Sequence, residues 1–253
     1  MQFGRVQYQG KEVFGVLEGD TIKEATPSPE QKPAFSEPIP LADVRILPPV
    51  LPTKIVGVGL NYHAHAQEMG KPVPDQPLLF LKPATTVIGM NDPIVLPPQS
   101  ERVDYEGELA VVMGQRCRAV SPAQASQYIL GYTCINDVTA RDIQKHDVQY
   151  TRAKSFDGFA PVGPFLVTEI DPTRLALRTY VNGEVKQEGN TSDMVFSVNE
   201  LVAFISSVMT LLPGDMIATG TPPGVGPMQN GDKVEVEIEG LGRLSNPVVT
   251  AGA

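Results

Sequence analysis

Short runs in which apolar and polar side chains alternate mark the beginning of the chain. Val6-Gln7-Tyr8 and Val13 to Leu17 are two such runs, and the turn-forming stretches Gln9-Gly10 and Glu18-Gly19-Asp20 interrupt them. Alternation with a period of two is typical of strands that bury one face. The pattern therefore predicts a small β meander between Phe3 and Lys23.

Eight prolines follow between residues 27 and 52. Proline cannot donate a backbone hydrogen bond and fixes its own φ, so this density excludes a helix or a central strand and favours an extended connector. We expect a domain boundary near residue 50. This divides the chain into a small N-terminal β domain with its connector, residues 1–50, and a larger domain, residues 51–253.

The larger domain is predicted to be rich in strands. The candidates are apolar runs, most of them flanked by Gly, Pro, Asn or Asp, at residues 54–59, 88–96, 109–113, 165–168, 177–181, 216–219 and 234–238. Helices are expected from Asn61, as N-cap, through Met69, from Ser121-Pro122 to Gly131, and after the capping box that runs from Ser197 to Glu200. This pattern predicts a mainly β fold with some α (α+β), a roll or barrel, in preference to a doubly wound sheet.

Charge and composition narrow the class of protein. The formal net charge of −9 repels nucleic-acid phosphates, so nucleic acid is not an expected partner. No run approaches the roughly 18 apolar residues that a membrane span needs, and Met1 to Arg5 lacks the apolar run of a signal peptide. We therefore expect a cytoplasmic enzyme or binding protein that does not act at a membrane.

Three acidic residues are candidate metal ligands. Glu106 and Glu108 precede an apolar run, and strand alternation places both on one face, where burial and mutual repulsion favour a neutralising cation. Asp137 follows the strand-like residues 132–136. A set of carboxylates without thiolate or imidazole selects Mg²⁺ or Mn²⁺, with Ca²⁺ as a possible substitute. The alternatives are an exposed acidic strand face for the glutamates and a helix N-cap for Asp137.

His65 and Glu68 lie three residues apart on the predicted helix and so share a face. A carboxylate that orients an imidazole makes a plausible general base, although an ordinary surface pair has the same spacing. A rival hypothesis, a zinc hydrolase built on His63-Ala64-His65, requires a strand at this position. The predicted helix argues against it.

Two further segments carry candidate chemistry. Lys154 lies in a polar stretch that a flexible loop can bring over the site, or it is simply solvated. The segment Gly220 to Gly226 forms a rigid turn without the Lys-Ser/Thr of a phosphate loop. Its amides and the Thr221 hydroxyl are able to bind a carboxylate, and a purely structural turn is the alternative.

In this order the motifs resemble those of the fumarylacetoacetate hydrolase family, over roughly residues 50–249. The matching motifs are Asn-Tyr-x-x-His-x-x-Glu at 61–68, Asp-Tyr-Glu-x-Glu at 104–108, Asp-x-Thr-Ala-Arg-Asp at 137–142, Ala-Lys-Ser-Phe at 153–156 and Gly-Thr-Pro-x-Gly-Val at 220–225. The resemblance implies a mixed β-sandwich roll, usually dimeric, with a smaller N-terminal domain. Residue by residue it implies Glu106, Glu108 and Asp137 as metal ligands, His65, Glu68 and Lys154 as catalytic residues, and Arg141, Gln144 and Thr221 as substrate contacts.

The same resemblance implies a small 2-oxo acid as substrate. Hydrolysis of a C–C bond in an acylpyruvate is the leading expectation. Decarboxylation of oxaloacetate and isomerisation of a 2-hydroxyhepta-2,4-diene-1,7-dioate type of diacid use the same residues and stay open, because fold and family do not choose among them. A non-catalytic protein that binds a small acid is the second alternative.

Overall fold

The computed structural model describes residues 1–26 and 33–252. Its first three strands, β1 Gln2–Tyr8, β2 Lys11–Glu18 and β3 Thr21–Glu24, form the predicted antiparallel meander. Gln9 and Gly10 both have positive φ and make the first turn. The buried side chains of Val6, Val13, Ile22 and Ile39 form a small core of their own.

Part of the proline-rich connector, residues 27–32, lies outside the described residues. The described part of the connector has more regular structure than predicted. It contains β4 Ile39–Pro40, the 3₁₀ turn η1 Leu41–Asp43 and β5 Arg45–Leu47. β4 pairs with β3 at the end of the sheet, and β5 pairs with β1. These are short strands at the margin of the meander, a position that tolerates proline because one side of the strand needs no partner.

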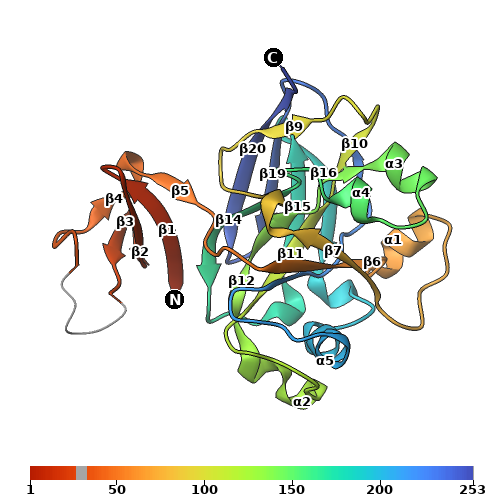
Figure 1. Cartoon of the computed structure of the whole chain (residues 1–253), viewed down its shortest axis with the longest axis horizontal. Helices are drawn as coiled ribbons and strands as arrows, with labels where there is room; N and C mark the ends of the chain where they lie inside the picture. Colours follow the sequence, from red (N-terminus) through yellow and green to blue (C-terminus); the bar gives the residue numbers. More distant parts are fainter. Residues whose placement is uncertain (27–32, 253) are drawn as a thin grey trace.

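The N-terminal meander and the large domain share one sheet (Figure 1). β1 joins β14 through the pairs Gln2↔Val167 and Phe3↔Leu166, and the order along the sheet is β4-β3-β2-β1-β14-β12-β11-β17-β6-β7. Its strands from the large domain are β6 Lys54–Gly59, β7 Leu78–Pro83, β8 Val87–Ile88, which pairs with β14 off this path, β11 Gly107–Met113, β12 Ile129–Asn136, β14 Ala160–Val167 and β17 Met216–Ala218. The 3₁₀ turn η2 Ala84–Thr86 precedes β8.

A second sheet packs against the first and closes the main core. Its order is β16-β15-β19-β20-β9, with β9 Ile94–Leu96, β15 Ala176–Val181, β16 Glu184–Asn190, β19 Lys233–Ile238 and β20 Gly242–Thr250. A third, small sheet has the order β13-β10-β18, with β10 Val103–Tyr105, β13 Thr139–Ala140 and β18 Gly226–Pro227. Val111 of β11, Leu177 of β15 and Ile205 of the helix α5 meet in the largest apolar cluster. The mainly β, mixed-sheet architecture that the sequence predicts is confirmed.

Five short helices lie around the sheets (Figure 1) in the part of the chain that is described. They are α1 His63–Glu68, α2 Pro122–Ala125, α3 Arg141–His146, α4 Thr151–Lys154 and α5 Val198–Val208, with the 3₁₀ turns η3 Ser126–Tyr128, η4 Pro172–Arg174 and η5 Thr191–Asp193. The predicted capping box of α5 is present, because Ser197 and Glu200 bond each other's backbone N–H. Among the described residues, no helix has the length and apolar character to cross a bilayer.

The sequence placed two helix ends wrongly. Asn61 does not cap α1: its amide donates to the Thr219 carbonyl at 2.7 Å and accepts from the Phe196 N–H at 2.8 Å, so it ties three distant segments together. The helix that begins after Ser121 does not reach Gly131, because it tightens into a 3₁₀ turn and the chain enters β12 at Ile129. In both places tertiary contacts override the local signal.

The run at residues 88–96 is not one strand. Gly89 donates its N–H to the Asp92 carboxylate at 2.9 Å, and Asn91 has a φ of 66°, so the chain turns between β8 and β9. β8 pairs with β14 in the first sheet and β9 pairs with β20 in the second. An apolar run gives no sign that its two halves belong to different sheets.

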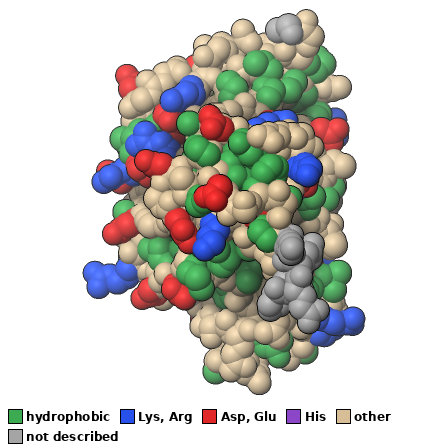
Figure 2. Space-filling view, turned by 90° about the vertical axis from the view of Figure 1, so that its left-hand side faces the viewer, with side chains coloured by type: hydrophobic (Ala, Val, Ile, Leu, Met, Phe, Trp, Pro, Cys, Tyr) green, Lys and Arg blue, Asp and Glu red, His purple; other side chains and the backbone are tan. Residues whose placement is uncertain are grey.

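Figure 2 shows the face that carries the N-terminal strands, turned toward the reader. Acidic and basic side chains are interspersed there between apolar ones. This face therefore shows neither a concentrated basic surface nor a concentrated acidic one.

Candidate active site

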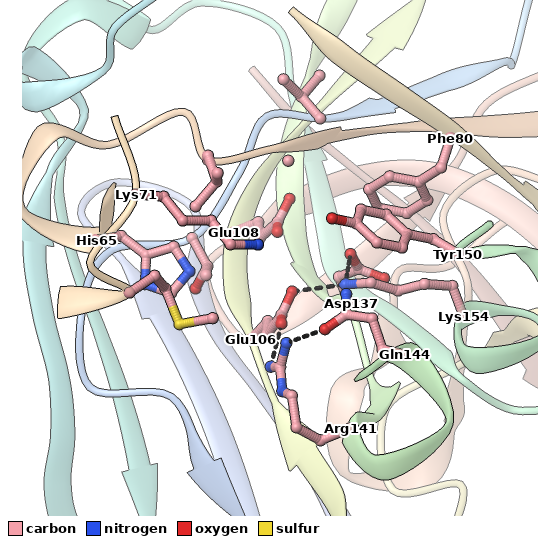
Figure 3. Close-up of a pocket in the computed structure, with 15 residues that line it drawn as sticks. His65, Lys71, Phe80, Glu106, Glu108, Asp137, Arg141, Gln144, Tyr150 and Lys154 are labelled. Carbon is pink, nitrogen blue, oxygen red and sulfur yellow. Dashed lines mark hydrogen bonds and ion pairs between the residues drawn. The ribbon is translucent and has the colours of Figure 1, made fainter. Parts of the chain in front are cut away.

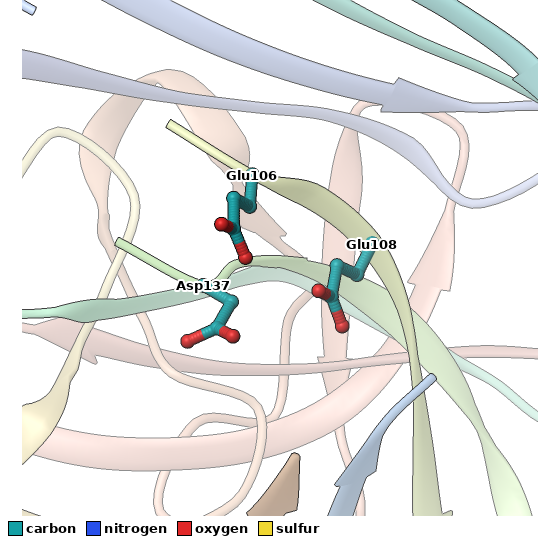
Figure 4. A group of neighbouring side chains, drawn as sticks. All are labelled: Glu106, Glu108 and Asp137. Carbon is teal, nitrogen blue, oxygen red and sulfur yellow. The ribbon is translucent and has the colours of Figure 1, made fainter. Parts of the chain in front are cut away.

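Three carboxylates converge where two neighbouring interior strands of the first sheet meet, at the start of β11 and the end of β12 (Figure 4). Glu106 and Glu108 flank Gly107, the first residue of β11, and Asp137 directly follows β12. One oxygen from each lies within 4.8 Å of the others, and the three residues are 5%, 1% and 1% exposed. The structure therefore excludes the alternative in which the glutamates face solvent.

Local packing explains why these acids meet. β10 ends at Tyr105 in the small sheet and β11 begins at Gly107 in the large one, so Glu106 is the residue where the chain passes between sheets. Its N–H donates to the Asn136 side chain at 2.9 Å and its carbonyl accepts from Asp137 N–H at 2.8 Å. A Cβ on Gly107 would stand 2.1 Å from the Thr179 hydroxyl oxygen, so only glycine fits between the two glutamates.

Two buried lysines face the acids. Lys154 donates from Nζ to Glu106 at 2.7 Å and to Asp137 at 2.6 Å, and Lys82 donates to the other Asp137 oxygen at 2.6 Å. Lys154 ends the short helix α4 and is 2% exposed, so it is neither on a flexible loop nor solvated. Sequence reasoning missed Lys82. A signal existed, since Lys82 occupies the buried register of β7 together with Phe80 in an otherwise apolar run.

The pKa values of the two glutamates separate for a physical reason. Burial raises the pKa of Glu106, but Lys154 and Arg141 outweigh it and lower that pKa to about 2. Among the described residues, no lysine or arginine forms an ion pair with Glu108: burial, Asp137 and Glu106 raise its pKa well above the ordinary value, more than the charge of Lys154 lowers it, and the Gly220 N–H donates to its carboxylate at 2.8 Å. The residues present fit a hard divalent ion, because a cation between the three oxygens compensates the charge that burial penalises at Glu108.

His65 and Glu68 form the expected pair on α1. His65 Nδ1 lies 2.9 Å from a Glu68 oxygen, and the second Glu68 oxygen accepts the Gly224 N–H at 2.9 Å. His65 is buried and lines the pocket, whereas His63 is exposed on the same helix. The His63-Ala64-His65 segment is helical, which removes the strand geometry that the zinc hypothesis requires.

The turn from Gly220 to Gly226 holds two of these carboxylates in place. The amide of Gly220 binds Glu108 and the amide of Gly224 binds Glu68. The Thr221 hydroxyl donates to the Gly107 carbonyl at 2.9 Å and accepts from Gln187 at 2.7 Å. The turn's amides therefore bind carboxylates, as its composition suggested, but here they are the protein's own.

Arg141 binds three side chains of the site. Its guanidinium donates to Asp104 at 2.8 Å, to Gln144 at 2.6 Å and to Glu106 in a short hydrogen bond. Arg102 binds the same Asp104 carboxylate from the other side, at 2.9 Å. Arg141 therefore fixes the orientation of Glu106, and Gln144 is oriented by Arg141.

One pocket with a cavity volume of about 50 Å³ collects most of the candidate site residues (Figure 3), and the ones that line it are His65, Glu106, Glu108, Asp137, Arg141, Gln144, Lys154 and Thr221. His65 and Lys71 lie on one side, and Arg141, Gln144 and Lys154 lie on the other. Phe80 and Tyr150 form part of the wall, with the Lys154 ammonium 4.9 Å from the centre of the Phe80 ring. The arrangement combines three carboxylates that could hold a hard ion, an oriented imidazole and several cations in one partly enclosed space.

This fold and site define a class of enzyme, and comparison with known proteins names it. Residues 54–249 match the family described as fumarylacetoacetate (FAA) hydrolase C-terminal, and residues 1–49 match a family described as Rv2993c-like, N-terminal. The chain belongs to the fumarylacetoacetate hydrolase family. The resemblance stated from its motifs is confirmed.

Three relatives show the range of activities in this family. The crystal structure of 5-carboxymethyl-2-hydroxymuconate delta-isomerase from Mycobacterium smegmatis is 48% identical, with a TM-score of 0.92, and covers 100% of both chains. Maleylpyruvate hydrolase from Sphingobium sp. SYK-6, solved with manganese(II) and pyruvate, is 33% identical, with a TM-score of 0.83, and covers 99% of both chains. Human mitochondrial oxaloacetate tautomerase is 45% identical over 83% of this chain and 71% of its own.

Proposed function

We propose that this protein is a divalent-metal-dependent enzyme that acts on a small 2-oxo acid, with hydrolysis of a C–C bond in an acylpyruvate as its reaction. One observation carries the proposal: the carboxylate cluster of Glu106, Glu108 and Asp137 opens into the pocket that the buried His65 also lines. Family membership supports an enzyme of this kind.

Glu106, Glu108 and Asp137 would hold Mg²⁺ or Mn²⁺, with Ca²⁺ as a substitute. The manganese in the maleylpyruvate hydrolase structure supports this choice. When bound, the ion would orient the carboxylate and keto oxygens of a 2-oxo acid and stabilise the negative charge that develops on the keto oxygen.

The chain's own groups supply the proton transfers. His65, oriented by Glu68 through the 2.9 Å contact, takes a proton from a water molecule that attacks the distal carbonyl of the acylpyruvate. The bond between that carbonyl carbon and the CH2 carbon of the pyruvate part breaks. The products are a carboxylic acid and the enolate of pyruvate. The proton that His65 took from the water then passes to the enolate carbon, which gives pyruvate and returns His65 to its starting state.

Lys154 keeps the acids in place and adds positive charge beside the reacting oxygen. Arg141 and Gln144 stand on the pocket wall opposite His65, where they would contact the substrate carboxylate, and Thr221 lines the same space. Since Arg141 already binds Asp104, Glu106 and Gln144, its main contribution is to position Glu106 and Gln144.

Tautomerisation of oxaloacetate is the second candidate. The similarity to human oxaloacetate tautomerase favours this reaction. Tautomerisation also requires fewer catalytic groups than hydrolysis, because it needs proton transfer at one carbon and no attacking water. Isomerisation of a muconate-type diacid and decarboxylation of oxaloacetate use the same arrangement.

The test is a panel assay of the purified protein with Mg²⁺ or Mn²⁺. Acetylpyruvate and fumarylpyruvate report hydrolysis, oxaloacetate reports tautomerisation and decarboxylation, and a hydroxymuconate-type diacid reports isomerisation. We expect cleavage of an acylpyruvate and inhibition by oxalate, which resembles the enolate of a 2-oxo acid. Turnover of oxaloacetate alone would replace hydrolysis with tautomerisation or decarboxylation, and full metal binding without any turnover would favour an acid-binding protein.

A further inference from the structure

Three cationic side chains line the pocket, and they differ in what they contact. Arg141 and Lys154 are each bound to carboxylates of the site. The third is Lys71, which is exposed at the mouth. Within the described parts of the chain, its ammonium has no hydrogen bond or ion pair. Lys71 is therefore the pocket cation whose charge is not already balanced by the protein.

The end of helix α1 fixes the backbone of Lys71. Gly70, with a φ of 62°, donates its N–H to the Gln67 carbonyl at 3.0 Å, and the Lys71 N–H donates to the Ala66 carbonyl at 3.0 Å. This pair of hydrogen bonds is a Schellman motif, in which a left-handed glycine reverses the chain after the last turn. Pro72 follows and prevents the helix from continuing. The place of Lys71 is thus tied to the helix that carries His65.

The direction of the Lys71 side chain shows where its ammonium lies in the pocket. Lys71 extends from the His65 side of the pocket toward the carboxylates, across from Arg141 and Gln144 (Figure 3). A 2-oxo acid held at the carboxylate cluster by its 1-carboxylate and keto oxygen directs its remaining carbons away from the ion. An acidic group at that far end needs a cation that is free to bind it.

We propose that Lys71 binds a second, distal carboxylate of the substrate, so that the protein prefers 2-oxo diacids to 2-oxo monoacids. This inference rests on the proposed function, because it assumes that a 2-oxo acid occupies the pocket. It narrows the substrate class within that function. Dicarboxylic acylpyruvates and oxaloacetate fit it, and acetylpyruvate fits it less well.

Binding tests this preference without requiring turnover. Calorimetry with Mn²⁺ present compares 2-oxoglutarate with 2-oxopentanoate, which have the same chain length and differ in the distal carboxylate. We expect the wild type to bind the diacid at least about tenfold more tightly, the contribution of one charge-assisted hydrogen bond. Lys71→Met removes this preference, and Lys71→Arg keeps most of it.

Lys145→Met is the matched control, because Lys145 is an exposed lysine on α3 that does not line the pocket and its loss changes the net charge equally. Lys145→Met should keep the wild-type preference for the diacid. Equal affinity of the wild type for both acids, or an equal loss for both in Lys71→Met, overturns the role of Lys71. A preference that Lys71→Met abolishes, in a protein that turns over nothing on the panel, keeps the role of Lys71 and overturns the proposed reaction. Failure of the wild type to bind either acid overturns both.

Discussion

The Lys82 ammonium donates a 2.6 Å hydrogen bond to Asp137, and neither side chain reaches solvent. Lys154 binds the other oxygen of the same carboxylate, so Asp137 is held between two buried ammonium groups. Asp137 is therefore fixed before any ligand arrives.

Lys82→Met should destabilise the protein. The substitution removes one of two cations from a buried carboxylate, and loss of one partner from a buried pair costs about 3 kcal/mol. Denaturant unfolding measures the change. Lys186→Met is the control, because Lys186 pairs with Glu184 at the surface and should contribute little. Equal stability of the two variants would contradict the structural role of Lys82.

Glu108→Gln should weaken Mn²⁺ binding by at least about tenfold, because the ion loses a charged ligand. Isothermal titration measures the affinity. Glu101→Gln removes an exposed carboxylate from the loop before β10 and should leave the affinity unchanged. An unaltered titration in Glu108→Gln, or an equal loss in the control, would show that the ion binds elsewhere.

The affinity for the ion should also rise with pH. Burial and the neighbouring acids raise the pKa of Glu108, and the ion binds only its charged form, so binding competes with a proton below that pKa and releases it. Glu106, with a pKa of about 2, is already ionised and adds no pH dependence near neutrality. Mn²⁺ titrations over a series of pH values should show an affinity that rises with pH in the wild type and changes less in Glu108→Gln. The same shift means that the metal-free protein loses stability as pH rises through the pKa of Glu108.

His65→Ala should leave the affinity for Mn²⁺ intact and lower kcat by about a hundredfold or more, the usual contribution of a general base. His63→Ala changes an exposed imidazole on the same helix and should keep full activity. A metal titration and a turnover assay on both variants separate the two effects. Comparable activity in the two variants would remove His65 from the mechanism.

Asp215→Asn tests a carboxylate outside the site. Asp215 accepts hydrogen bonds from Thr53, Lys54 and the Leu212 N–H, and these outweigh burial and lower its pKa. A lowered pKa stabilises the fold above the unfolded value, near 4, and this stabilisation is lost as pH falls through the folded value. At pH 7 the free energy of unfolding of Asp215→Asn should be about 2 kcal/mol lower than that of the wild type. The difference in the free energy of unfolding between the variant and the wild type should become smaller in acid. A difference that does not change with pH would contradict the stabilising role of the Asp215 charge.

Part of the fold was predictable from sequence because its signals are local. The turns at Gln9-Gly10 and Gly19 and the capping box of Ser197 and Glu200 each depend on residues within a few positions of one another. The strands were found for a similar reason, since β11 is an apolar run buried on both faces. The signals failed where distant segments compete for a side chain, as Thr219 and Phe196 do for Asn61.

The residues of the candidate site also fall into two groups, those that the sequence predicts and those that only the structure shows. Glu106, Glu108, Asp137, His65 and Glu68 were named from spacing and motif, and the structure brings them together. Lys82 was missed, because its place in the apolar register of a strand signals burial but does not show which acid it will face. The two amides that hold Glu68 and Glu108 belong to glycines more than a hundred residues away, and no spacing rule connects them.

The sequence by itself determined the strand-rich character of the chain, its turns and the kinds of chemical group available for a hard-ion site, because these follow from side-chain type and short-range spacing. Only the tertiary structure decided which charges are balanced. Burial and pairing make Glu106 strongly acidic, raise the pKa of Glu108 and leave Lys71 without a carboxylate partner among the described residues. The energy of a charge depends on its distance from other charges and from water, and the fold sets both.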